Sequence, residues 1–92
     1  MDTVYRDRVL NLMRAEVEKI PAAAGVHYTL DSNSFFSDVE LAVGFEVCFA
    51  HIYRHEQPPG GAITTTLYGT AEVHVPEAGL EFADVSITKV ED

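Results

Sequence analysis

The stretch VELAVGFEVCFAHIYRH, residues 39–55, has the clearest periodic pattern in the chain. Its odd-numbered positions are apolar as far as Tyr53, with His51 as the exception. Its even-numbered positions are mostly small or charged, as at Glu46 and Cys48. A period of two over this length is typical of a β-strand with one buried face. The pattern therefore predicts one long strand over 39–55, bent or bulged because of its length, with its odd-numbered side chains in the core.

Shorter alternating segments predict three more strands, at about 26–31, 62–75 and 80–90. Turn-forming residues separate the strands, which favours a meander of antiparallel neighbours. In the last strand the apolar positions change sides once. A one-residue bulge near Ala83–Asp84 would keep its large apolar residues, Phe82 among them, on the core side.

The segment QPPGG, residues 57–61, must form the loop between the two longest strands. If this loop closes a hairpin, the numbers of paired residues sum to about 118. The register then places Phe45 opposite Val73 in the core. It also places Glu46 opposite Glu72 on the outer face, where two like charges would destabilise the pair.

Residues 3–20 carry a helical pattern instead, because apolar residues recur every three or four positions. Pro21 ends the helix, since it lacks an N–H donor and disfavours helical geometry in the residue before it. The apolar stripe consists of Tyr5, Val9, Leu12, Met13, Val17 and Ile20. We therefore expect a single α+β domain over 1–92, with the N-terminal helix packed on one face of a four-stranded antiparallel meander sheet.

Charge is unevenly distributed along the chain. Residues 1–20 hold four acids and four bases, whereas residues 21–92 hold eleven acids against only Arg54 and Lys89. The whole net charge of −9 therefore lies after the helix. Such a surface repels nucleic acids and acidic membranes, and it attracts basic proteins. The alternative interpretation is that the charge only keeps a small protein in solution.

The sequence contains no run that approaches the ~20 apolar residues of a membrane-spanning helix. Its first segment, MDTVYRDRVL, carries acids and arginines where a signal peptide has an apolar stretch. Cys48 is the only cysteine, so it cannot form an internal disulfide or a cysteine-based zinc site. Burial in mid-strand should also raise the pKa of its thiol and make it unreactive. These features predict a cytoplasmic protein that does not bind membranes.

Catalytic and metal-binding patterns are weak. His51 and His55 share one strand face, but four residues along a strand span about 13 Å, which is too far for one metal ion. We expect no metal, no cofactor and no enzymatic activity. The remaining alternative is a small enzyme or ligand-binding dimer, which would need Glu46, Glu72 and His74 to converge as acid–base groups.

The outer face of the predicted hairpin offers a different kind of site. Its side chains are small, with acids set among them, so the face is flat enough to pack on another protein. Two adjacent phenylalanines and the proline-containing tip at 56–61 could supply anchors. The candidate partner-binding residues are Glu40, Glu46, Glu72, His74, Phe35, Phe36 and Glu56. The alternative is a solvated face, phenylalanines tucked under the sheet and an ordinary turn.

The sequence thus favours a small acidic, non-catalytic module that binds and inhibits a basic partner protein, one that itself binds nucleic acid. Spaced carboxylates would mimic phosphates, without direct binding of nucleic acid by this chain. In size and charge the chain is similar to inhibitors encoded by phages and other mobile elements, including anti-CRISPR proteins, although no motif carries this similarity. The alternative is a structural subunit that assembles with itself, as a homodimer or larger oligomer.

Overall fold

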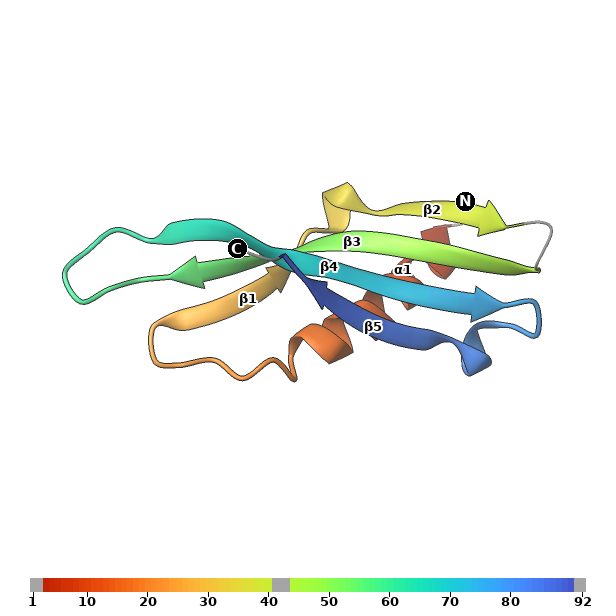
Figure 1. Ribbon diagram of the computed structural model, residues 1–92, viewed down its shortest axis with the longest axis horizontal. Helices are drawn as coiled ribbons and strands as arrows, with labels where there is room; N and C mark the ends of the chain where they lie inside the picture. The colour runs from red at the N-terminus through yellow and green to blue at the C-terminus, as the bar shows by residue number, and fades with distance from the viewer. Residues whose placement is uncertain (1–2, 41–43, 91–92) are drawn as a thin grey trace.

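The computed structural model describes residues 3–40 and 44–90. Within these residues it contains one α-helix, five strands and two short 3₁₀ turns. They are α1 (Thr3–Val17), β1 (Val26–Leu30), η1 (Ser32–Ser34), β2 (Phe36–Glu40), β3 (Phe45–Glu56), β4 (Thr64–Pro76), η2 (Leu80–Phe82) and β5 (Asp84–Lys89). The helix crosses one face of a twisted antiparallel sheet (Figure 1). This arrangement confirms the predicted α+β class and the antiparallel meander.

The sheet is built around β3 and β4, which pair with each other along their whole length. β5 pairs with the outer edge of β4, while β1 and β2 lie one after the other along the outer edge of β3. The predicted strand 39–55 is therefore wrong as a single unit, because its first residues belong to β2 and its main part to β3. Gly44 precedes β3 with a φ of +70°, which glycine adopts without strain. The alternating pattern runs across this glycine without a break, and residues 41–43 lie outside the described part of the chain.

The core lies between α1 and the sheet. Its buried side chains are Val9, Leu10, Met13 and Val17 of α1, Cys48, Ala50 and Ile52 of β3, and Ala71, Val73 and Val75 of β4. The helical stripe was predicted without Leu10, which is only 1% exposed. The helix ends at Val17 rather than at residue 20, and a turn follows in which Lys19 pairs with Glu16. No helix in the described residues is long and apolar enough to cross a membrane.

The face of β3 that packs against α1 is the opposite of the predicted one. The even-numbered side chains Cys48, Ala50 and Ile52 are each 0% exposed and belong to the core. The odd-numbered Phe45 and Phe49 lie on the other side of the sheet, outside the core cluster. Small side chains suit the covered face because the larger side chains of the helix fill the space above them.

The register of the β3–β4 hairpin accounts for this difference. Phe45 pairs with Pro76, and Cys48 pairs with Val73, so the residue numbers sum to 121 over most of the hairpin. Because this sum is odd, even-numbered residues of β3 share a face with odd-numbered residues of β4. The predicted pairing of Phe45 with Val73 is wrong, although Val73 is in the core as expected.

One irregular position interrupts the hairpin, between Ile52 and Tyr53. Ile52 pairs with Gly69, whereas the next residue, Tyr53, pairs with Leu67. Tyr68 therefore has no partner on β3 and is an extra residue of β4. At Gly69 a Cβ atom would collide with the backbone carbonyl of Thr88 in β5. This glycine therefore allows β5 to approach β4 closely beside the extra residue.

The chain between β4 and β5 also differs from the prediction. Residues 80–82 form the turn η2, which takes the place of the predicted bulge near Ala83–Asp84. Leu80 and Ala83 pack against the core, but Phe82 is 62% exposed. The predicted core position of Phe82 is wrong because side chains in a 3₁₀ turn do not alternate as they do in a strand.

Candidate functional site

The sheet face opposite α1 is covered by no other element among the described residues, and Figure 1 views the sheet from this side. Successive side chains of a strand point to opposite sides, so the odd-numbered residues of β3 and their cross-strand partners lie here. We call this surface the helix-free face. Its central residues are Phe36 and Asp38 of β2, Phe45, Val47, Phe49 and His51 of β3, Thr70, Glu72 and His74 of β4, and Asp84, Ser86 and Thr88 of β5.

Aromatic rings form the centre of the helix-free face. Phe36 stacks on Phe49 with 4.8 Å between the ring centroids and 21° between the ring planes. Phe45 stacks on the imidazole of His74 with a centroid distance of 5.8 Å. Val47 lies between these ring pairs and is 8% exposed, whereas Phe36 is 50% exposed. The rings therefore shield the valine but remain partly in water themselves.

Carboxylates border the rings on both sides. Asp38 pairs with Val47 on the β2 side. Glu72 and Asp84 lie on the side of β4 and β5, where Nε2 of His74 is 3.2 Å from Oε1 of Glu72. An apolar centre with a charged border is the usual composition of a protein-binding surface.

Lysine and arginine are absent from the helix-free face, because the structure describes all six of them elsewhere. The sheet residue Arg54 pairs with Glu56 at 2.7 Å. Nζ of Lys89 lies 5.6 Å from the ring centroid of Tyr68, which packs against the core on the helix side. The other four are on α1 or directly after it: Arg6, Arg8, Arg14 and Lys19. The carboxylates of the helix-free face therefore have no lysine or arginine among their neighbours on that face.

The structure brings three of the seven predicted partner-binding residues together. Phe36 and Glu72 lie in one row across the sheet, on either side of Phe49, and His74 lies in the next row. Glu40 is the last residue of β2, and its side chain lies outside the described ones. The helix-free face thus holds one phenylalanine, one glutamate and one histidine of the predicted set.

Glu46 is on the opposite side of the sheet, where it accepts a hydrogen bond of 2.6 Å from the hydroxyl of Tyr5. Burial, reinforced by this carboxylate, raises the pKa of the Tyr5 hydroxyl. Burial and the same carboxylate raise the pKa of the Cys48 thiol to about 12, in the expected direction. The sheet therefore separates Glu46 from Glu72 and His74 within one chain.

Two other predicted residues also lie away from the helix-free face. Phe35 packs against the core, and the guanidinium carbon of Arg6 is 5.4 Å from its ring centroid. It is thus directed away from its neighbour Phe36. Glu56 ends β3 at the projecting end of the hairpin, in its ion pair with Arg54.

Sequence reasoning missed Asp38, Phe45 and Phe49 as surface residues because it placed the odd-numbered face of β3 in the core. One signal in the sequence does point to the correct face. His51 and His55 interrupt the odd-numbered positions, and histidine suits a partly exposed surface better than an apolar core.

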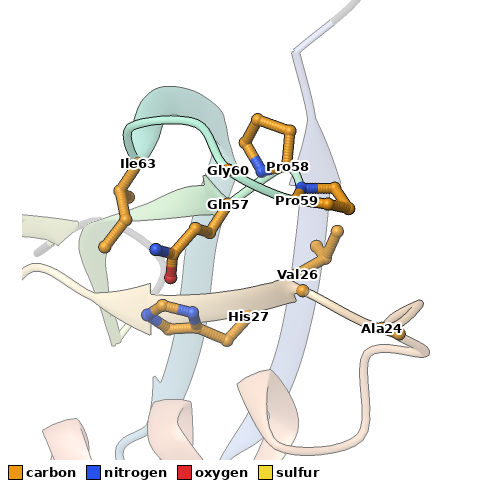
Figure 2. Close-up of a pocket in the computed structure, with 9 residues that line it drawn as sticks. Ala24, Val26, His27, Gln57, Pro58, Pro59, Gly60 and Ile63 are labelled. Atoms are coloured by element: carbon orange, nitrogen blue, oxygen red, sulfur yellow. The ribbon is translucent and has the colours of Figure 1, made fainter.

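A hollow lies at the projecting end of the molecule (Figure 2). The loop between β3 and β4 meets the start of β1 there, and the backbone N–H of Gln57 donates to the carbonyl of Gly25 at 2.9 Å. The hollow has a volume of about 600 Å³ and is lined by Ala24, Gly25, Val26, His27, Gln57, Pro58, Pro59, Gly60 and Ile63. Its lining is mostly apolar and holds no carboxylate or ammonium group, so it offers little polar chemistry to a ligand.

Histidines do meet near this end of the sheet. The rings of His27 and His55 stack with 4.6 Å between centroids. The two ring nitrogens of His55 lie 2.7 Å from the hydroxyl of Thr29 and 2.9 Å from that of Thr65. Across residues 3–40 and 44–90, no group of three or more His, Cys, Asp and Glu side chains is arranged to hold a metal ion.

Comparisons with known proteins give no functional assignment, so the conclusion about function rests on the geometry of the chain. No family model matches the chain, and neither a curated protein nor a solved structure matches it. The candidate site is the helix-free face, which combines partly exposed rings with carboxylates that have no lysine or arginine beside them.

Proposed function

We propose that this chain is a non-catalytic protein-binding module that docks its helix-free face onto a basic partner protein. The observation that carries the proposal is the gathering of stacked rings and three carboxylates on the sheet face that α1 leaves uncovered. Removing apolar surface from water stabilises a complex by about 25 cal/mol per Å². The rings would supply this term, and the carboxylates would select the charge of the partner.

The expected partner is itself a nucleic-acid-binding protein. Such a protein presents lysines and arginines in the pattern of a phosphate backbone, which an acidic face complements. Docking there would exclude nucleic acid, so the module would act as an inhibitor by mimicking nucleic acid and would not bind nucleic acid directly. We also propose that the chain is encoded by a phage or another mobile element and that it acts in the cytoplasm.

Matched variants of exposed phenylalanines test the proposal. Phe36 and Phe82 are 50% and 62% exposed, but only Phe36 lies on the helix-free face. A partner captured from a nuclease-treated lysate would be purified, and its affinity measured by calorimetry over a salt series. We expect Phe36→Ala and Glu72→Lys to weaken binding, and Phe82→Ala and Glu18→Lys to leave it unchanged. Equal effects of the two phenylalanine variants, or binding that is insensitive to salt, would contradict the proposal.

Self-assembly is the second candidate, because a second copy could also cover the half-exposed ring of Phe36 and the partly buried ring of Phe49. It is less favoured, since two copies face to face would bring their carboxylates together without a cation between them. Sedimentation at increasing protein concentration separates the two functions. A dimer that is lost in Phe36→Ala would establish self-assembly in place of a basic partner.

A further inference from the structure

The row Phe36, Phe49 and Glu72 crosses three neighbouring strands of the helix-free face. Adjacent strands are about 4.8 Å apart, so the row places a carboxylate roughly one strand spacing from the nearer ring. A ring surface next to a carboxylate is suited to a cation that is flat and carries hydrogen-bond donors at its edge.

The two rings offer a stacking platform. Their planes are 21° from parallel, and the outer ring, Phe36, is half exposed. Elsewhere the chain places its own cations over rings, with Arg6 at 5.4 Å from the centroid of Phe35 and Lys89 at 5.6 Å from that of Tyr68. No lysine or arginine of the chain occupies the corresponding position over Phe36 and Phe49, since all six lie on α1, directly after it, or on the helix side of the sheet.

Glu72 supplies the charge beside this platform. Its side chain is 29% exposed, and Oε1 contacts Nε2 of His74 at 3.2 Å. Among the described residues no side chain donates a hydrogen bond to its Oε2. A carboxylate that is partly withdrawn from water interacts more strongly with a cation than a fully exposed one.

From this arrangement we infer that the helix-free face recognises arginine in preference to lysine, with the guanidinium packed against the Phe36–Phe49 pair at its Phe49 end and hydrogen-bonded to Glu72, the cross-strand neighbour of Phe49. A guanidinium is planar and weakly hydrated, and it can stack and donate at the same time. An ammonium is compact and strongly hydrated, so it gains less from a ring surface. The inference rests on the proposed function and names the side chain of the partner that the face selects.

Two labelled peptides of equal charge, nona-arginine and nona-lysine, test this selection by fluorescence anisotropy with the full chain at low and moderate salt. We expect nona-arginine to bind about tenfold more tightly than nona-lysine. Phe36→Ala and the isosteric Glu72→Gln should reduce this ratio to about twofold or less. Phe82→Ala and Glu18→Gln, matched in residue type and placed elsewhere, should keep the ratio of the unmodified chain. Circular dichroism melts would show that each variant is folded.

The other outcomes separate the inference from the proposed function. Equal affinities for the two peptides, both weakened by Glu72→Gln but not by Glu18→Gln, would overturn arginine selection and leave the docking of basic partners in place. Equal affinities that no variant alters would overturn both, because the attraction would then come from net charge alone. Absence of nona-arginine binding at low salt would also overturn both.

Discussion

The two faces of β3 differ in side-chain size and in exposure, and the face that carries the large aromatic rings is the more exposed one. On the side of α1 the strand presents Cys48, Ala50 and Ile52, all fully buried. On the helix-free side it presents larger rings, Phe45 and Phe49, which are only partly buried. The helix fills the space above Cys48 and Ala50, so small residues are sufficient at these two positions. Large residues on the second face have no such cover in the described chain, which indicates that volume alone does not identify the core side of a strand.

The two faces should differ most in the free energy of unfolding that is lost when a side chain is truncated. Ile52→Ala removes a fully buried side chain, and we expect it to lower the free energy of unfolding by about 2–5 kcal/mol. Its neighbour Tyr53, which points to the other side and is partly exposed, should lose clearly less when changed to alanine. Urea denaturation measures both values. Equal losses would mean that the assignment of the two faces is incorrect.

Alkaline pH should act on the covered face alone. The ordinary pKa of a cysteine thiol is 9.0, and that of Cys48 is raised to about 12. The unfolded chain therefore releases a proton above pH 9 that the folded chain retains, and stability falls as the pH rises from 9 towards 12. The slope approaches about 1.4 kcal/mol per pH unit for this group, and Tyr5 adds to it in the same direction at higher pH. Denaturation at a series of pH values measures the slope, which should be smaller in Cys48→Ala; an identical slope in the variant would contradict the assignment to this thiol.

The hydrogen bond between Tyr5 and Glu46 should contribute less. Tyr5→Phe removes the donor and leaves the carboxylate under the helix with one partner fewer. We expect a loss of about 1–2 kcal/mol, as is usual for hydrogen bonds to charged groups. The double variant with Glu46→Gln would show the coupling between the two side chains. The contact of His74 with Glu72 on the other face, which is more exposed, should give a coupling near zero when measured in the same way.

Phe36→Ala should have only a small effect on stability, although it weakens binding of the partner. Its ring is half exposed and packs on Phe49 rather than on the core, so we expect a loss of only about 0.5–1 kcal/mol. Thermal unfolding should therefore be similar to that of Phe82→Ala. A loss as large as that of Ile52→Ala would show that the ring is part of the folding core rather than of a binding surface.

Local patterns were sufficient to predict α1, the short strand at 26–31 and the turn after Asp31, whose carboxylate accepts a hydrogen bond from the backbone N–H of Asn33. The long-range register was not predictable in the same way. It depends on Tyr68 as an extra residue and on the turn at Gly44, and neither interrupts the alternation of apolar residues. Alternation defines two faces of a strand, but it does not say which one the helix covers. The predicted outer face therefore has the correct side of β4, with Glu72 and His74, but the wrong side of β3.

The break between β1 and β2 has a consequence for how the molecule meets its own copies. At this point His51 of β3 has no strand beside it on the edge of β1 and β2, yet its backbone N–H donates to Oγ of Ser34 and its carbonyl accepts from the N–H of Asp31, both at 2.8 Å. The turn η1 therefore satisfies the ladder of β3 while it divides the outer edge into two strands of five residues each. An incoming strand finds no long continuous row of free amide and carbonyl groups on this side. The sheet is thus protected from edge-to-edge aggregation along β1 and β2 by the turn that separates these two strands.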